Sequence, residues 1–166
     1  MIIRDEHTED ADILHQLTYD AFKPMTFSND SEADCLRQLR ADGDLFVSLV
    51  AELNDEIIGH AAFSPAHIGA EAGRWFGLGP ISVRIDHQRQ GVGRALIAKG
   101  LERLRASGAA GCVLLGNPDV YRSSGFRSDG QLTYGDLPTK LVQHVCFSGA
   151  SPVGEVTFAP GLAATD

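Results

Sequence analysis

Hydrophobic residues recur at helical spacing in three segments of the chain. The first segment follows Thr8, which can cap a helix, and it ends at Lys23-Pro24. The second follows the capping residues of "NDSEAD" and ends at Gly43, and the third begins at residue 91 and ends at Gly108. The apolar stripes are Ile13, Leu14, Leu17, Ala21 and Phe22; then Ala33, Leu36 and Leu39; then Val92, Leu96, Ile97, Gly100, Leu101 and Leu104.

Apolar runs rich in β-branched residues predict strands between these helices. "MIIRDE" opens the chain, and "LFVSLVAEL" and "IIGHAAFSPAHI" flank Asn54-Asp55, a strong hairpin signal. "FGLGPISVR" follows a glycine-rich link at 69–73, and "GCVLLG" is expected to be a buried strand. A short helical piece is predicted at 118–123, and the strand-like runs "LVQHVCF" and "GEVTFA" complete the set.

The predicted order of elements is β-α-α-β-β-β-α-β-α-β-β. This order favours an α+β (or α/β) fold with a mixed central sheet of about six or seven strands and about four flanking helices. At 166 residues the chain is long enough for one core without a disulfide or a metal. We therefore expect a single domain over residues 1–166, with 160–166 as a tail that frays.

Charge and composition narrow the classes of function. A formal net charge of −8 argues against nucleic-acid binding and suits a cationic substrate as well as an ordinary cytosolic protein. The opening "MIIRDEHTED" lacks the apolar region of a signal peptide, and no apolar run reaches 18 residues. We expect a cytoplasmic protein with no membrane contact. The three cysteines and six histidines have no metal-ligand spacing, so no metal is predicted.

Two glycines at the start of the third helix raise a chemical question, because glycine weakens helix propagation by about 1 kcal/mol. They lie in "HQRQGVGRAL", residues 87–96, as Gly91 and Gly93. Free amides at a helix N-terminus, together with the helix dipole, form an anion site, and the missing Cβ atoms let a phosphate approach the backbone. Arg89 and Arg94 add positive charge. The segment is neither a P-loop nor a GxGxxG dinucleotide fingerprint.

The longer run "GPISVRIDHQRQGVGRALI" resembles the acetyl-coenzyme A signature of the GNAT N-acetyltransferase superfamily, and in particular a group of bacterial predicted N-acetyltransferases. The family core, Gln/Arg-x-x-Gly-x-Gly/Ala, is matched by residues 88–93. The strand "ISV" precedes it, the next strand ends at "LLGNP", and "YRSSGF" matches the family's Tyr-x-x-x-Gly-Phe element. The order of elements resembles that fold over essentially the whole chain.

The resemblance implies acetyl-CoA as co-substrate and transfer of its acetyl group, by direct attack, to a primary amine of a small molecule or peptide. Tyr121 falls on the family's acid position, where it would protonate the thiolate, or else it is only a packing residue. The expected coenzyme-binding residues are Ile81, Ser82, Val83, Gln88, Arg89, Gln90, Gly91, Val92, Gly93, Arg94 and Asn117. Asn117 departs from the family pattern, because it lies four residues before the tyrosine rather than about seven.

The general base and the acceptor stay open at this stage. "GLGPISVR" has no carboxylate where many relatives carry one, which leaves Ser82, His60, His67 or a water. The substrate loops are expected at 22–32 and 68–76, where Phe22, Phe27, Trp75 and Phe76 form either an apolar wall or the edge of the core.

The missing carboxylate motivates an alternative to an enzyme, namely a non-catalytic acyl-CoA-binding regulatory module with the same fold. A nucleotide- or phosphosugar-binding enzyme is a third interpretation, which would use the glycine loop alone. The partners expected are an amine substrate and, as an alternative to a monomer, a second copy in a homodimer.

Overall fold

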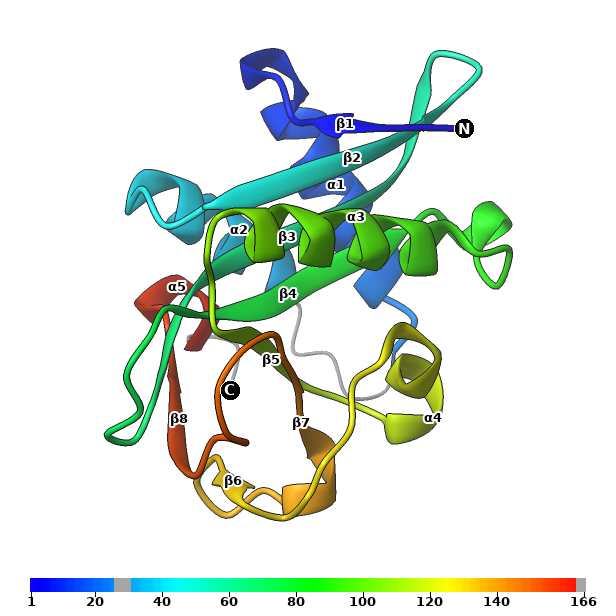
Figure 1. The fold of residues 1–166 in the computed structure, drawn as a ribbon. Helices are drawn as coiled ribbons and strands as arrows, with labels where there is room; N and C mark the ends of the chain where they lie inside the picture. The colour runs from blue at the N-terminus through cyan, green and yellow to red at the C-terminus, as the bar shows by residue number, and fades with distance from the viewer. Residues whose placement is uncertain (26–30, 164–166) are drawn as a thin grey trace.

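The computed structural model describes residues 1–25 and 31–163 and confirms a mixed sheet flanked by helices (Figure 1). Six strands follow one another in the order β1-β2-β3-β4-β5-β7, and β8 and β6 extend the sheet from β3. The strands are β1 (Ile2–Asp5), β2 (Val47–Leu53), β3 (Glu56–Ile68), β4 (Trp75–Val83), β5 (Gly111–Leu115), β6 (Leu132–Thr133), β7 (Val142–Cys146) and β8 (Gly154–Phe158). The helices are α1 (Ala11–Phe22), α2 (Glu32–Ala41), α3 (Val92–Ala106), α4 (Pro118–Tyr121) and α5 (Pro160–Ala163).

Strand β3 organises the sheet because its thirteen residues serve three partners. It pairs antiparallel with β2 and β4, and its last three residues pair with β8. The predicted hairpin between β2 and β3 is confirmed, since Asn54 and Asp55 have φ values of 51° and 65°. Two successive positive φ angles are those of the tight turn whose twist matches the flanking strands.

Helix α3 covers one face of the sheet, and α1 and α2 cover the other (Figure 1). On the α3 face, Leu96 and Leu104 pack with Phe63 in the largest apolar cluster. A Cβ atom at Gly100 would lie 2.1 Å from the Phe63 ring, so this glycine allows the helix to approach β3 closely. On the opposite face, Leu14 of α1 packs with apolar residues of α2, β2 and β3.

Two local expectations differ from the structure. Trp75 and Phe76 belong to β4 and are 4% and 3% exposed, so they are core residues and line no substrate loop. The residues Pro160–Ala163, expected to belong to a tail, form α5, whose Gly161 is buried against Leu39 of α2. The predicted capping residues 29–30, the aromatic residue Phe27 and the last three residues of the tail lie outside the described residues.

Candidate active site

Strands β4 and β5 separate after a short contact, and the separation leaves one edge of β4 open. Their parallel pairing covers only Trp75–Gly77 opposite Gly111–Val113. Beyond Gly77, no described strand pairs with β4 on that side, while β5 continues to pair with β7. A bulge accompanies the separation: Ala61 lies opposite Ile81 and Phe63 opposite Leu78, so two residues of β4, Gly79 and Pro80, face one of β3.

The open edge of β4 exposes the backbone groups of alternate residues. The amide of Arg84 donates to Ile58 O on β3 at 2.8 Å, so the polar groups of Ser82 also point toward β3. Those of Ile81 and Val83 therefore point into the gap, as the resemblance implies for two coenzyme-binding residues. The Ser82 side chain lies on the α1–α2 face, opposite the faces of Ile81 and Val83, which makes Ser82 the exception among the three.

The turn from β4 to α3 is closed by its own side chains. Gln88 Nε2 donates to Val83 O at 2.9 Å, and Gln90 Nε2 donates to Asp86 O at 3.4 Å. Arg89 has a φ of 62° and Gly91 one of 89°, so two left-handed residues turn the chain into the helix. The predicted Gln88 and Gln90 thus have structural partners within the turn itself.

Helix α3 begins with amides that have no cap. Ala95 N donates to Gly91 O at 3.0 Å, and the amides of residues 92–94 precede this first helical bond. Gly91, at the N-cap position, receives no side-chain cap. A Cβ atom at Gly91 would meet nothing within 4 Å, and one at Gly93 would lie 3.8 Å from Ile81 Cδ1 and Val83 Cγ2. Gly91 therefore leaves open space at the helix N-terminus, and Gly93 lies within van der Waals reach of two side chains of β4.

Positive charge lies beside this space. The side chains of Arg89 and Arg94 are exposed and form no ion pair with any other residue in 1–25 or 31–163. Nearby Arg84, in contrast, is held by Asp86 at 2.7 Å and Glu56 at 3.0 Å. Uncapped amides, a helix dipole and guanidinium groups without an ion pair are the features that anion sites in proteins use.

Tyr121 lies beyond the end of β5. Its ring contacts Phe126 edge to face, at 6.4 Å between centroids, and a Cβ atom at Gly116 would lie 2.6 Å from its Cε2. Its phenol has no hydrogen-bond partner among the residues that the structure describes, and burial raises its pKa above the usual value. The group is therefore protonated at neutral pH. It packs against the same apolar cluster as Ile81 and Val83.

Asn117 has a structural role in the fold. Its Oδ1 accepts a hydrogen bond from Asp119 N at 2.9 Å, which caps α4 ahead of Pro118. This bond occupies one acceptor of the side chain that the resemblance assigns to the coenzyme. The irregular spacing to Tyr121 is consistent with a cap at this position.

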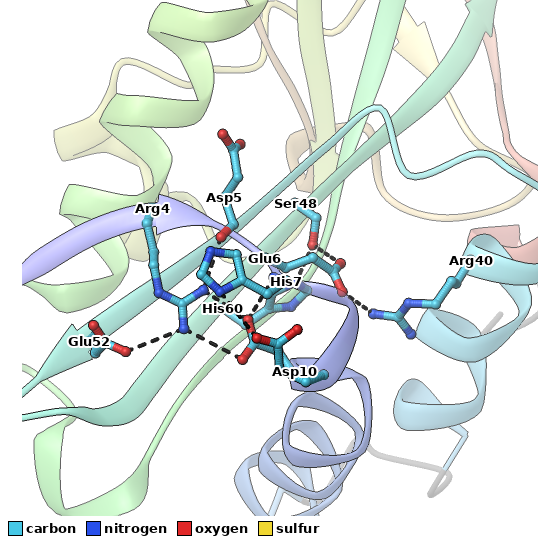
Figure 2. A network of polar contacts seen from close by, with 10 residues as sticks. Arg4, Asp5, Glu6, His7, Asp10, Arg40, Ser48, Glu52 and His60 are labelled. Atoms are coloured by element: carbon cyan, nitrogen blue, oxygen red, sulfur yellow. Dashed lines mark hydrogen bonds and ion pairs between the residues drawn. The ribbon is translucent and has the colours of Figure 1, made fainter.

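The two histidines offered as bases lie in different surroundings. His67 is exposed and pairs with Thr157 on β8, away from the open edge of β4. His60 is fully buried directly opposite Ser82, and its Nε2 lies 2.7 Å from Ser48 Oγ (Figure 2). Burial lowers the pKa of His60 to about 4, so the ring is neutral at pH 7.

Two further observations concern metal sites and membrane-spanning helices. Within residues 1–25 and 31–163, no group of histidine, cysteine and acidic side chains has the arrangement of a metal site. In the same described ranges, no helix is long and apolar enough to cross a membrane.

Comparison with known proteins agrees with this geometry. Residues 11–126 match the model of the acetyltransferase (GNAT) family. A GNAT family acetyltransferase from Brucella melitensis, crystallised with acetyl-CoA, is 41% identical, with a TM-score of 0.85 over 96% of each chain. The structure of the N-acetyltransferase YhbS from Escherichia coli, crystallised with CoA, is 29% identical, with a TM-score of 0.88 over 98% of this chain and 91% of that one.

Comparison of sequences alone finds similarity to a relative over part of this chain and part of the relative. The sequence of the uncharacterized N-acetyltransferase YhbS of Escherichia coli K12 is 38% identical over 108 residues. The match covers 64% of this chain and 65% of that relative, just under two thirds of its length.

The low pKa of His60 predicts a specific dependence of stability on pH. Between pH 6.5 and about 4 the unfolded chain binds a proton at this histidine and the native chain does not, so the free energy of unfolding falls as the pH falls. The difference in pKa corresponds to about 3 kcal/mol. Urea unfolding of the wild type and of His60→Gln should show this loss in the wild type only. Equal pH profiles for the two proteins would contradict the assignment.

Proposed function

Because this chain belongs to the acetyltransferase (GNAT) family, we propose that it is an N-acetyltransferase that moves the acetyl group of acetyl-CoA to a primary amine of a small molecule or peptide. One observation carries the proposal: the open edge of β4 leads directly into the uncapped N-terminus of α3. The fold thus sets a row of free backbone groups beside an anion site. An elongated ligand with an amide-bearing arm and a pyrophosphate matches both parts.

The pyrophosphate would be held by the amides at the start of α3. Gly91 and Gly93 leave the space, the amides of residues 92–94 have no helical partner, and Arg89 and Arg94 supply unpaired charge. Gln88 and Gln90 contribute by holding the turn in shape through Val83 O and Asp86 O. This division assigns binding to the backbone and the two arginines.

The arm and thioester of the coenzyme would lie along β4. The free amides of Ile81 and Val83 are donors for a pantetheine carbonyl and for the thioester oxygen. The bound thioester supplies an activated acetyl group. The task of the chain is then to orient that group, to accept a proton from the amine and to donate one to sulfur.

Tyr121 is proposed as the proton donor to sulfur. It is protonated at neutral pH, its hydroxyl is uncommitted among the described residues, and its ring is fixed by Phe126 and Gly116. A fixed ring with a free hydroxyl suits a general acid.

Coenzyme binding and thiol release test the function together. Acetyl-CoA at 100 times its dissociation constant should stabilise the protein by about 2.7 kcal/mol and raise the melting temperature, whereas NADH and ATP should not. Release of CoA thiol should then be measured with polyamines, amino acids, aminoglycosides and peptides. Binding with no release across the panel would favour a non-catalytic acyl-CoA-binding module, and no binding at millimolar acetyl-CoA would overturn the proposal.

Gly93→Val tests the phosphate cradle. The side chain would crowd Ile81 and Val83 beside the helix N-terminus, so acetyl-CoA affinity should fall at least tenfold; Gly93 lies within α3, so valine meets no strain from a positive φ. Gly43→Ala is the matched control, since its φ of 75° is strained for alanine and its surroundings are empty. The control should lose about 1 kcal/mol of stability and keep its affinity. Equal calorimetric affinity in a folded Gly93→Val protein would contradict the cradle.

Tyr121→Phe tests the acid. The ring and its packing stay, and one proton donor is lost, so the single-turnover rate should fall by about 10²–10⁴-fold. Affinity for acetyl-CoA should change little, since one hydrogen bond contributes only about 1 kcal/mol. A wild-type single-turnover rate in the variant would make Tyr121 a packing residue.

A further inference from the structure

Four polar side chains cross the sheet on the face covered by α1 and α2. Glu6 follows β1, Ser48 lies on β2, His60 on β3 and Ser82 on β4. The four residues therefore come from four strands that are successive neighbours in the sheet. We call these four residues the polar row. Figure 2 shows its outer part, with Ser48 between Glu6 and His60. Val50 and Ala62 form an apolar cluster with α1 and α2 on the same face.

The bonds within the row fix the direction of its hydrogens. Ser48 Oγ contacts both the Glu6 carboxylate and, at 2.7 Å, His60 Nε2. A carboxylate only accepts, so Ser48 donates to Glu6 and His60 donates its Nε2 hydrogen to Ser48. His60 Nδ1 therefore carries a lone pair that faces away from the sheet edge.

This lone pair and the Ser82 hydroxyl are the unsatisfied part of the row. His60 is 0% and Ser82 2% exposed, and neither Nδ1 nor Oγ has a hydrogen-bond partner among the described residues. The two residues are directly opposite in the β3–β4 register. Cβ atoms of such pairs lie about 4.5–5.5 Å apart, so another side-chain rotamer of Ser82, or one water between the two groups, would join them.

The ends of the row lie at two different places. Ser82 is flanked by Ile81 and Val83, whose amides are proposed to hold the coenzyme. Glu6 reaches a crevice of about 520 Å³ that is also lined by Ser48 and Arg40. Arg40 Nη2 donates to Glu6 Oε2 at 2.6 Å and holds the carboxylate at the crevice wall. The row thus runs from a buried residue of β4, next to the amides proposed to hold the coenzyme, to the surface.

We propose that the polar row carries the proton of the acceptor amine away from β4 to solvent, with Ser82 as the group that touches the amine and His60, Ser48 and Glu6 as positioning residues that act through it. This inference rests on the proposed acetyl transfer and names the base that β4 itself lacks.

The proton steps balance along the row. As the amine nitrogen forms its bond to the acetyl carbon and the carbon–sulfur bond breaks, the nitrogen proton passes to Ser82 Oγ, and the Ser82 hydroxyl proton passes to His60 Nδ1. His60 releases its Nε2 proton to Ser48, which releases its own to Glu6 and then to water in the crevice. Sulfur takes its proton from Tyr121. Proton exchange with water moves the His60 hydrogen from Nδ1 back to Nε2, and rotation of the hydroxyls then restores the starting state.

The surroundings of His60 suit a relay and not a store of charge. Burial lowers its pKa, and among the charged groups that face it, Glu6 and Asp10 oppose that effect while Arg40 adds to it. A histidine that disfavours the charged form does not stay protonated at neutral pH.

Ser48→Ala tests the proposal, because it removes a hydroxyl from the middle of the row and leaves Ser82 and Glu6 unsubstituted. The single-turnover acetylation rate at saturating amine should fall by about 100-fold, the low end of the effect of acid–base catalysis. The single-turnover rate of His60→Gln should fall by the same factor. The rate of the double variant should fall no further, since both substitutions interrupt the same path. The rate of each variant should also keep rising with pH where the wild type reaches a plateau, as hydroxide replaces the relay.

Ser64→Ala is the matched control. Ser64 is also a fully buried serine of β3 without a hydrogen-bond partner in the described residues, but it lies opposite Gly77, outside the row. It should keep the wild-type rate and pH profile. Wild-type rates in folded Ser48→Ala and His60→Gln, or equal losses in Ser64→Ala, would overturn the relay.

Nitrogen NMR of His60 gives a readout that needs no turnover and separates this proposal from the enzymatic one. The wild type at pH 7 should show a neutral ring with its hydrogen on Nε2, and Ser82→Ala should shift the Nδ1 resonance. A hydrogen on Nδ1, or no response to Ser82→Ala, overturns the relay even where acetylation is observed. If the protein acetylates no amine and yet shows the hydrogen on Nε2 and the response to Ser82→Ala, the proposed function is wrong while the geometry of the polar row is supported.

Discussion

The separation of β4 from β5 is the constraint on which the candidate site depends. A strand that stayed paired along its whole length would use every amide on that edge. The bulge at Gly79 and Pro80 redirects β4 after three paired residues, and Pro80 has no N–H group to offer a neighbour. The groups of Ile81 and Val83 are left for a ligand. Pairing on the opposite edge, with β3, holds the redirected strand in place.

Helix α3 turns this opening into a site because it starts where β4 ends. Arg89 and Gly91 reverse the chain within a short turn, and the helix then packs its apolar stripe on the face that Ile81 and Val83 share. Amides without a cap and arginines without an ion pair make the N-terminus of α3 slightly less stable than a capped one. The close fit of Gly100 on Phe63 fixes the helix nevertheless, so the helix N-terminus stays in one position relative to β4.

Local signals account for what the sequence predicts well. The hairpin at Asn54-Asp55 and the helix that begins after Gly91 are set by neighbouring residues, and both occur where predicted. Trp75 and Phe76 were placed at the end of an expected substrate loop at 68–76, as an apolar wall or as the edge of the core, whereas pairing with β3 extends β4 to residue 75. Such pairing is a long-range effect that no local pattern reveals.

The polar row was not predictable for the same reason. His60 was one of several candidate bases, and only the registers of β1 to β4 bring it between Ser48 and Ser82. Bulges in both β2–β3 and β3–β4 pairings set those registers, and a shift of one residue would turn His60 to the α3 face.

The absence of a carboxylate on the third predicted strand also has a physical explanation in this arrangement. That strand, β4, lies between two apolar layers, where an unpaired ionised side chain is costly. Neutral groups, Ser82 and His60, occupy the buried positions, and the charge of Glu6 lies at the sheet edge beside Arg40 and an open crevice. Hydrogen-bonded neutral groups pass protons without holding charge, so the chain keeps a dry core under its reactive strand and still links that strand to water.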